Sequence, residues 1–269
     1  MPDAPDILQR IASAAREPLA RRKAARPEAE LRRRIKDRAP AKSLFASLKS
    51  QEGRRIIAEL KKASPSKGVI RPDFRFEAFA KEYIDAGAAA ISVLTEENFF
   101  LGSLAYLEKV ASLAAGTPVP VLRKDFLFDP YQVIEARAAG ADAILLIAAL
   151  IPSDGLFADL LTLAHELGMD ALCEAHTAEE TDRLLRLNAR IVGVNSRDLR
   201  TFHTDISRTG ELLKRIPSSC VSVAESGIRE EADFEKLPAD AFLIGELLMR
   251  AAHPGEKLRE LRGGRSCAH

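Results

Sequence analysis

Charged and amide side chains recur directly after short apolar segments of the chain, where they could move protons and bind an anion. The first such segment ends in Glu59, Leu60 and Lys61. Side chains two residues apart in a strand point the same way, so Glu59 and Lys61 share one face. A carboxylate and an ammonium group on one face could act as an acid–base pair or form a structural ion pair.

A pair of adjacent cations, Arg123 and Lys124, follows another of these segments. One of the two must point toward the shared site, but strand alternation alone does not choose between them. Later segments end in further polar or small residues: Glu174, Asn195, Arg197, Glu225, Ser226, Gly227, Gly245 and Glu246. Charged or amide residues after six of the eight segments fit a constructed polar site better than chance placement in loops.

The elements that must position these residues alternate along the chain. Apolar, β-branched segments predict strands at 55–60, 90–94, 120–123, 143–147, 170–173, 191–194, 221–224 and 241–244. Amphipathic patterns between them predict helices at 76–85, 104–114, 131–139, 156–167 and 179–187. Such alternation implies parallel strands, and 269 residues is close to the roughly 250 of one closed barrel. We expect a single (β/α)₈ TIM barrel over residues 1–269, with 1–50 as a helical N-terminal extension.

In such a barrel, reactive groups gather at the carboxyl ends of the strands, so Glu59 and Lys61 would point into the mouth. The loops after the last two strands often bind phosphate, and Ser226, Gly227 and Gly245 are small enough for close backbone approach. A doubly wound open sheet is the alternative fold. It is disfavoured because the loop after the first predicted strand lacks a glycine-rich dinucleotide pattern.

Composition limits the function classes. The formal net charge is +1, from 40 basic and 39 acidic residues, which gives no case for nucleic-acid or membrane-surface binding. No apolar run is long enough for a membrane span. Cys173, Cys220 and Cys267 cannot form a complete disulfide framework, so we expect reduced thiols and a cytoplasmic protein. No metal-ligand spacing appears, and the five histidines are interpreted as surface residues: His165, His176, His203, His253 and His269.

Five sequence motifs together resemble the indole-3-glycerol-phosphate synthase family. They are IAELKKASPS at 57–66, LRKDF at 122–126, LCEAH at 172–176, NSRDL at 195–199 and ESGI at 225–228, in the family's order. The helical N-terminal extension is also similar. Ala175, Thr177 and Ser196 depart from the residues expected there, but all three are chemically conservative.

The resemblance implies a carbon–carbon lyase of tryptophan biosynthesis that acts without a cofactor or metal. Its substrate would be 1-(2-carboxyphenylamino)-1-deoxyribulose 5-phosphate, converted to indole-3-glycerol phosphate, CO₂ and water. The resemblance also selects Lys124 over Arg123 as the inward residue and as the acid for ring closure. It leaves the later acid–base steps divided among Glu174, Glu59 and Lys61.

The resemblance also implies where the substrate binds. Polar contacts would come from Ser64, Asn195, Arg197 and Glu225, and an apolar bed for the aromatic ring from Phe100, Phe126, Leu145, Leu199 and Leu243. The phosphate would lie at Ser226, Gly227, Gly245 and Glu246, the last two through backbone N–H groups. Separate enzymes of the tryptophan pathway are possible partners. Whether the N-terminal segment covers the mouth or only packs against the barrel stays open.

A lysine suits acid work near neutral pH when burial or nearby cations lower its pKa. Convergence of Lys61, Lys124 and Arg197 is expected to do this, and nearby glutamates would oppose it. Two alternative functions stay open because fold does not fix function: another sugar-phosphate isomerase or lyase, and a non-catalytic barrel that binds a phosphorylated ligand. The intact set of Glu59, Lys61, Lys124 and Glu174 argues against the second.

Overall fold

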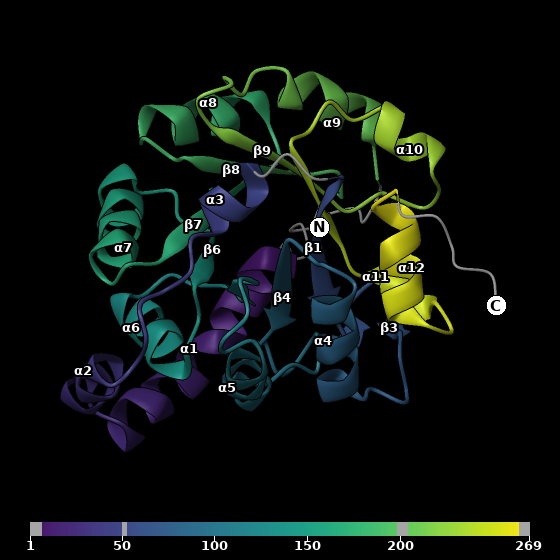
Figure 1. Cartoon of the computed structure of the whole chain (residues 1–269). Coiled ribbons are helices and arrows are strands. Elements are labelled where there is room, and N and C mark those ends of the chain that lie inside the picture. The colour runs from purple at the N-terminus through teal and green to yellow at the C-terminus, as the bar shows by residue number, and fades with distance from the viewer. Residues whose placement is uncertain (1–6, 50–52, 198–203, 264–269) are drawn as a thin grey trace, which may run out of the picture.

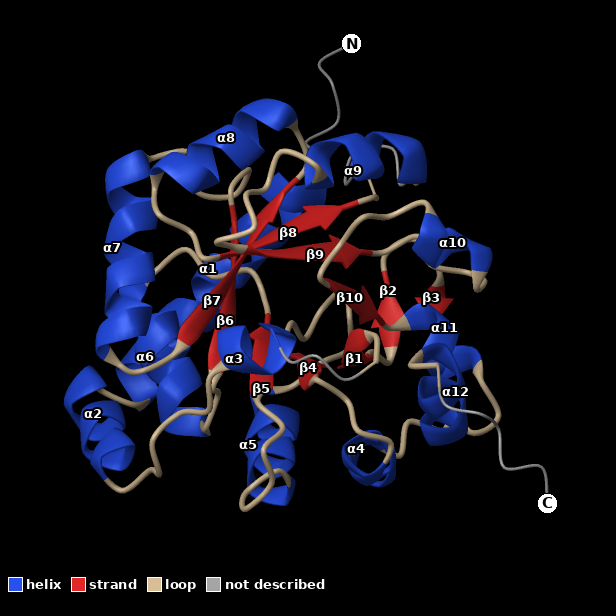
Figure 2. Ribbon diagram, turned by 45° about the horizontal axis from the view of Figure 1, so that its top comes forward, coloured by secondary structure: helices blue, strands red, loops and turns tan. Residues whose placement is uncertain are grey.

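A computed structural model describes residues 7–49, 53–197 and 204–263 of the chain. Eight parallel strands close into a barrel in the spatial order β1-β10-β9-β8-β7-β6-β5-β4 (Figure 2). They are β1 (Arg55–Leu60), β4 (Ala90–Leu94), β5 (Val121–Lys124), β6 (Ala143–Ile147), β7 (Asp170–Ala175), β8 (Ile191–Asn195), β9 (Val221–Glu225) and β10 (Ala241–Ile244). The predicted TIM barrel is confirmed.

Helices surround the barrel and return the chain to its amino end. They are α4 (Phe76–Asp85), α5 (Leu104–Leu113), α6 (Pro130–Ala139), α7 (Asp154–Glu166), α8 (Ala178–Arg186), α9 (Ile206–Leu213), α10 (Ala232–Glu235), α11 (Glu246–Arg250) and α12 (Pro254–Leu261). Several begin at a side-chain cap: the oxygens of Ser103, Asp129, Ser153 and Thr177 each accept a hydrogen bond from a first-turn N–H. These caps set where each loop at the barrel mouth ends.

Four strands run further than the sequence pattern predicts, β5, β7, β8 and β9. Parallel pairing continues through Leu94 with Lys124, so β5 ends at Lys124. Pairing of Ala175 with Val194 likewise carries β7 beyond Glu174. The hydrogen bonds between neighbouring strands continue past the last apolar residue of each predicted strand. The polar residues at these strand ends face the mouth. Lys124 and Glu174 are therefore held by the rigid sheet and not by loops.

The N-terminal segment contacts the barrel in three places. Helix α3 (Leu44–Lys49) lies across the amino ends of the strands, where Leu44 and Leu48 are fully buried against the barrel interior. Helix α2 (Glu28–Lys36) and the second half of α1 (Ile7–Ala25) pack on α6 (Figure 1). The first turns of α1 reach the opposite end, at the carboxyl ends of the strands.

Two apolar layers form the core. Inward-facing residues such as Ile57 and Leu145 fill the barrel, while outward-facing ones such as Leu60 and Leu146 pack under the helices. Full burial of each such side chain stabilises the fold by roughly 1.5–3 kcal/mol. A short antiparallel hairpin, β2 (Ala63–Ser64) and β3 (Gly68–Val69), follows β1 at the mouth. Among the described helices, none has the length and hydropathy to cross a membrane.

Candidate active site

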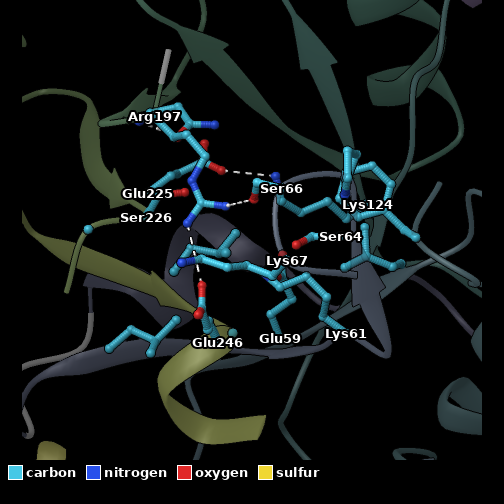
Figure 3. Close-up of a pocket in the computed structure, with 18 of the residues that line it drawn as sticks. Glu59, Lys61, Ser64, Ser66, Lys67, Lys124, Arg197, Glu225, Ser226 and Glu246 are labelled. Atoms are coloured by element: carbon cyan, nitrogen blue, oxygen red, sulfur yellow. Dashed lines mark hydrogen bonds and ion pairs between the residues drawn. The ribbon is translucent and has the colours of Figure 1, made fainter. Parts of the chain in front are cut away.

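The carboxyl ends of the barrel strands surround a cavity of about 610 Å³. Every predicted site residue that the structure describes lines it, and Leu199 lies outside the described residues. These lining residues are Glu59, Lys61, Ser64, Phe100, Lys124, Phe126, Leu145, Glu174, Asn195, Arg197, Glu225, Ser226, Gly227, Leu243, Gly245 and Glu246. Residues from all parts of the sequence therefore converge on one space (Figure 3).

Lys124 lies at the centre of the charged groups. Its Nζ is 3.1 Å from Oε2 of Glu225 and 3.3 Å from Oε2 of Glu174. The side chain is only 14% exposed. Arg123 takes the opposite face of β5 and is buried under the helices. The structure thus resolves the choice that strand alternation left open.

The pKa of Lys124 is shifted opposite to the expectation. Burial alone would lower it, but the carboxylates of Glu225, Glu174 and Glu59 together raise the pKa above its usual value. The predicted lowering by neighbouring cations is wrong, because those cations have partners of their own. Lys61 is paired with Glu59, and Arg197 with Glu246. In the free protein, Lys124 therefore carries its proton throughout the neutral pH range.

The two carboxylates beside Lys124 have different pKa values. Burial, reinforced by the nearby Glu174 charge and opposed by Lys124, raises the pKa of Glu225 to about 8. For Glu174, burial also acts to raise the pKa, but Lys124, His176 and the amide of Asn195 outweigh it and lower the value. At neutral pH this places a proton on Glu225 and leaves Glu174 ionised. One carboxyl group can donate a proton and the other can accept one.

Glycines make room for these carboxyl groups. A Cβ atom on Gly193 of β8 would overlap Oε1 of Glu225 on the neighbouring strand β9. A Cβ atom on Gly245 would overlap Oε1 of Glu59 and lie 3.0 Å from Nζ of Lys61. A side chain at either position would displace a charged group of the mouth.

Glu59 and Lys61 form a close pair on the floor of the cavity. The Nζ of Lys61 is 2.6 Å from Oε1 of Glu59, and the two side chains are 14% and 3% exposed. The nearby Ser64 hydroxyl is buried and has no hydrogen-bond partner among the described residues. A hydroxyl without a partner, aimed at a cavity, is available to a ligand.

Cations and small residues gather at one end of the cavity. Arg197 donates a hydrogen bond to Ser66 (3.0 Å) and is 3.5 Å from Glu246, which also pairs with Arg250 (3.0 Å) (Figure 3). Ser226 and Gly227 are consecutive residues with positive φ, 64° and 87°. Such a turn directs backbone N–H groups into a concave surface that suits an anion. This end of the cavity fits a phosphate group.

Another part of the cavity lining is apolar. The rings of Phe100 and Phe126 lie 6.0 Å apart, beside Leu145 and Leu243. The sequence interpretation missed three further apolar residues, Ile7, Leu8 and Ile11 of α1. Their spacing along one face of the first helix was the available signal. The structure places the first turns of this helix at the mouth, so the N-terminal segment lines the cavity as well as packing against the barrel.

Behind β5, Arg123 forms a buried network that fixes the strand end. Its guanidinium donates to Thr95 Oγ1 (3.1 Å), Asp125 Oδ2 (3.0 Å) and Glu135 Oε2 (3.0 Å). The backbone N–H of Thr95 in turn donates to the carbonyl of Lys124 (3.1 Å). Arg22 of α1 binds the other oxygen of Glu135 (2.9 Å). The N-terminal helix is thus connected to the strand that carries Lys124.

The histidine and cysteine predictions have mixed outcomes. His165 and His253 are exposed, and His203 and His269 lie outside the described residues. The prediction that His176 is a surface residue is wrong. Its side chain is only 15% exposed and lies against Glu174, because it directly follows β7. Cys173 and Cys220 are free thiols, and Cys267 lies outside the described part of the chain. The described residues contain no cluster of three His, Cys, Asp or Glu side chains placed to hold a metal ion.

The family model for indole-3-glycerol phosphate synthase matches residues 8–261 of the chain. This chain belongs to the indole-3-glycerol phosphate synthase family. An indole-3-glycerol phosphate synthase of Dehalococcoides mccartyi (strain 195) is 47% identical over 260 residues, which is 95% of this chain and 99% of that protein. An indole-3-glycerol phosphate synthase of Aromatoleum aromaticum is 45% identical over 264 residues, which is 96% of this chain and 99% of that protein.

The family predicted from the sequence is confirmed, and the predicted activity, a carbon–carbon lyase of tryptophan biosynthesis, is that of this family. A solved structure supports the fold alone. Thiamine phosphate pyrophosphorylase from Pyrococcus furiosus superposes with a TM-score of 0.59 at 15% identity, covering 78% of this chain and 94% of that one. Members of the indole-3-glycerol phosphate synthase family act on a phosphorylated small molecule, in keeping with the cationic end of the cavity.

Proposed function

We propose that the cavity at the barrel mouth converts 1-(2-carboxyphenylamino)-1-deoxyribulose 5-phosphate to indole-3-glycerol phosphate, CO₂ and water, with Lys124 as the proton donor for ring closure. The observation that carries this proposal is the position of Lys124. Its ammonium group lies between two buried carboxyl groups, in a cavity lined by both apolar and cationic side chains. The substrate has an aromatic ring at one end and a phosphate at the other.

The apolar and cationic parts of the cavity lining suggest how the substrate binds. The aromatic ring packs among Phe100, Phe126, Leu145 and Leu243, and Leu199 is proposed to join them. The phosphate lies at the turn of Ser226 and Gly227 and at the backbone N–H groups of Gly245 and Glu246. Asn195, Arg197 and Ser64 contact the polar middle of the molecule. Two anchored ends hold the reacting carbon atoms near each other, which lowers the entropy cost of ring closure.

Ring closure requires a proton at one oxygen. The aromatic carbon that bears the carboxylate attacks the ketone carbon of the sugar chain, and the ketone oxygen becomes a hydroxyl. Lys124 donates that proton, since it is protonated in the free protein and surrounded by groups that fix its position. Loss of CO₂ from the attacking ring carbon then breaks its bond to the carboxylate and restores aromaticity without any further acid or base.

Dehydration completes the indole ring. The new hydroxyl leaves as water, and a proton leaves the neighbouring ring carbon. In this proposal Lys61, paired with Glu59, protonates the leaving hydroxyl. Glu174, ionised at neutral pH, accepts the other proton, and Glu225 holds a proton beside Lys124. Atoms and electrons balance over the three steps, so the proposed reaction needs no oxidant, reductant or metal.

We further propose that the protein works in the cytoplasm and takes its substrate from, and passes its product to, separate enzymes of the tryptophan pathway. Indole fluorescence tests the activity directly. The purified chain is mixed with the carboxyphenylamino-deoxyribulose phosphate in buffer with a chelator, and product emission is followed. Emission that rises in proportion to protein concentration supports the proposal. Absence of emission at micromolar protein contradicts it.

A further inference from the structure

His176 lies directly behind the carboxylate of Glu174. Its Nε2 is 3.4 Å from Oε1 of Glu174, and its Nδ1 is 3.7 Å from Oε2 of Glu180 on α8. Lys124 approaches the other oxygen of Glu174, and the amide of Asn195 donates to Oε1 (3.2 Å). The imidazole therefore contacts the reactive carboxylate from the side opposite the cavity.

The geometry favours one protonation state of the ring. Each ring nitrogen faces a carboxylate, and a carboxylate can only accept hydrogen bonds. A neutral imidazole would turn one lone pair toward a negative charge. The imidazolium instead forms an ion pair with both Glu174 and Glu180, although neither ring nitrogen makes a hydrogen bond within the described residues. Glu225 on β9 also lies nearby and adds negative charge once it ionises, above about pH 8, while Lys124 lies beyond Glu174.

Local sequence fixes this arrangement. Thr177 begins α8, and its side chain accepts a hydrogen bond from the N–H of Glu180 (3.1 Å). Glu180 reaches back, and its Oε2 accepts from the backbone N–H of His176 (2.6 Å). The threonine and the glutamate three residues later resemble a capping box, except that the glutamate binds the N–H of the residue before the cap. The helix cap thus places both His176 and its second carboxylate partner behind Glu174.

We propose that His176 is a positioning residue of the reaction, held as an imidazolium by Glu180, which keeps Glu174 ionised and oriented between Asn195 and Lys124. This inference rests on the proposed function only where it concerns turnover. The charge of the ring and its contact with Glu174 can be tested without substrate.

The charges around the ring support the same assignment. Burial alone would lower the pKa of His176, but Glu180 and Glu174 outweigh it and raise the pKa above its usual value. His176 in turn adds to Lys124 in lowering the pKa of Glu174. Loss of the imidazolium should therefore raise the pKa of Glu174 and protonate it at a higher pH.

The first experiment is a histidine-selective NMR titration of the whole protein. In the wild type, His176 should titrate above the range of an exposed histidine, about 6.5, and the exposed His165 serves as the internal reference. In Glu180→Gln, the His176 midpoint should fall while that of His165 stays unchanged. A wild-type His176 midpoint at or below that of His165 overturns the proposal, as does a midpoint that Glu180→Gln leaves unchanged.

The second experiment compares the pH profile of kcat in His176→Asn with that in His165→Asn, a matched control on the exposed face of α7. We expect His176→Asn to lower kcat by roughly three- to tenfold with little change in KM, less than the hundredfold or more lost with a proton-transfer group. Its acid limb should move to higher pH, because Glu174 loses a cationic neighbour. A profile of unchanged shape overturns the proposal.

His176→Gln is the second variant if His176→Asn does not fold, and it should move the acid limb in the same direction. An unmoved limb in that variant counts against the proposal as well. Failure of the wild type to form product would overturn the proposed function, but the NMR titration would still decide the charge of His176.

Discussion

The ammonium group of Lys124 lies 3.1 Å from the carboxyl group of Glu225, which is buried in the barrel mouth. Glu174 approaches the same nitrogen at 3.3 Å, so two buried carboxyl groups share one cation. Full ionisation of both would leave an excess negative charge in a space of low polarity. Burial therefore raises the pKa of Glu225 to about 8, and the pair holds one proton at neutral pH.

This proton makes stability depend on pH. Because the folded-state pKa of Glu225 lies above its unfolded value, the folded protein binds the extra proton below pH 8. The corresponding stability is complete below the unfolded pKa, near 4.5, and is lost as pH rises through about 8. Glu225→Gln should remove this dependence, on the order of 1 kcal/mol per pH unit within that window. Urea unfolding of both proteins between pH 5 and 8 measures it, and a pH-independent difference between them would contradict the shifted pKa.

Replacement of Arg123 by methionine should destabilise the protein strongly. The guanidinium is 1% exposed and pairs with Asp125 and Glu135, so its loss leaves two carboxylates without a partner in the core. Breaking a buried ion pair from one side costs about 3–5 kcal/mol. Arg22→Met, which removes the more exposed partner of Glu135, is the control and should cost about 1 kcal/mol or less. Similar losses of unfolding free energy for the two variants would contradict this account of the network.

Gly245→Ala should impair turnover without a large loss of stability. The added methyl group overlaps the Glu59 carboxyl and approaches Lys61, so the pair must move. We expect kcat to fall by roughly tenfold or more, because small displacements in an active site are costly. Gly155→Ala in α7 is the matched control, since its new Cβ would meet nothing nearer than 3.9 Å. A kcat in Gly245→Ala equal to that of the wild type would show that turnover does not require Glu59 and Lys61 at their present positions.

Glu246→Gln should strengthen phosphate binding. The Glu246 side chain neutralises Arg197 and Arg250 at the cationic end of the cavity, whereas the proposed phosphate contact uses only its backbone N–H. Removal of the carboxylate charge should lower both KM and the inhibition constant of inorganic phosphate by about two- to fivefold, a gain of up to about 1 kcal/mol. Glu166→Gln, an exposed change on α7, should alter neither constant. A raised inhibition constant in Glu246→Gln would show that the carboxylate itself helps to hold the anion.

The alternation of predicted strands and helices along the chain predicted the barrel and most of its strand positions. It could do so because the spacing of apolar residues shows which face of each element is buried. The same rule placed Glu59 and Lys61 on one face. It could not choose between Arg123 and Lys124, since both are cations at one strand end. Only the positions of Glu225 and Glu135, about 100 and 12 residues further along, decide which cation faces the mouth.

Electrostatic consequences were harder to predict than positions. The expected lowering of the Lys124 pKa failed, because the sequence shows which cations exist but not which of them are already paired. His176 was interpreted as a surface residue, because the sequence around a single histidine after a strand does not indicate whether its side chain is buried. The capping pair of Thr177 and Glu180 is visible in the sequence and indicates that the following helix starts at once. It was the available signal that His176 lies close to the barrel.

We propose that Lys124 gives a proton during ring closure and does not merely attract the substrate. Lys124→Arg keeps a positive charge between Glu174 and Glu225, but a guanidinium group does not release a proton at neutral pH. Single-turnover indole formation, measured together with the substrate dissociation constant, separates the two roles. We predict a loss of 10²-fold or more in rate, in the range of general acid catalysis, with the dissociation constant changed only a few-fold. A rate within tenfold of the wild type, or equal losses in rate and binding, would contradict it.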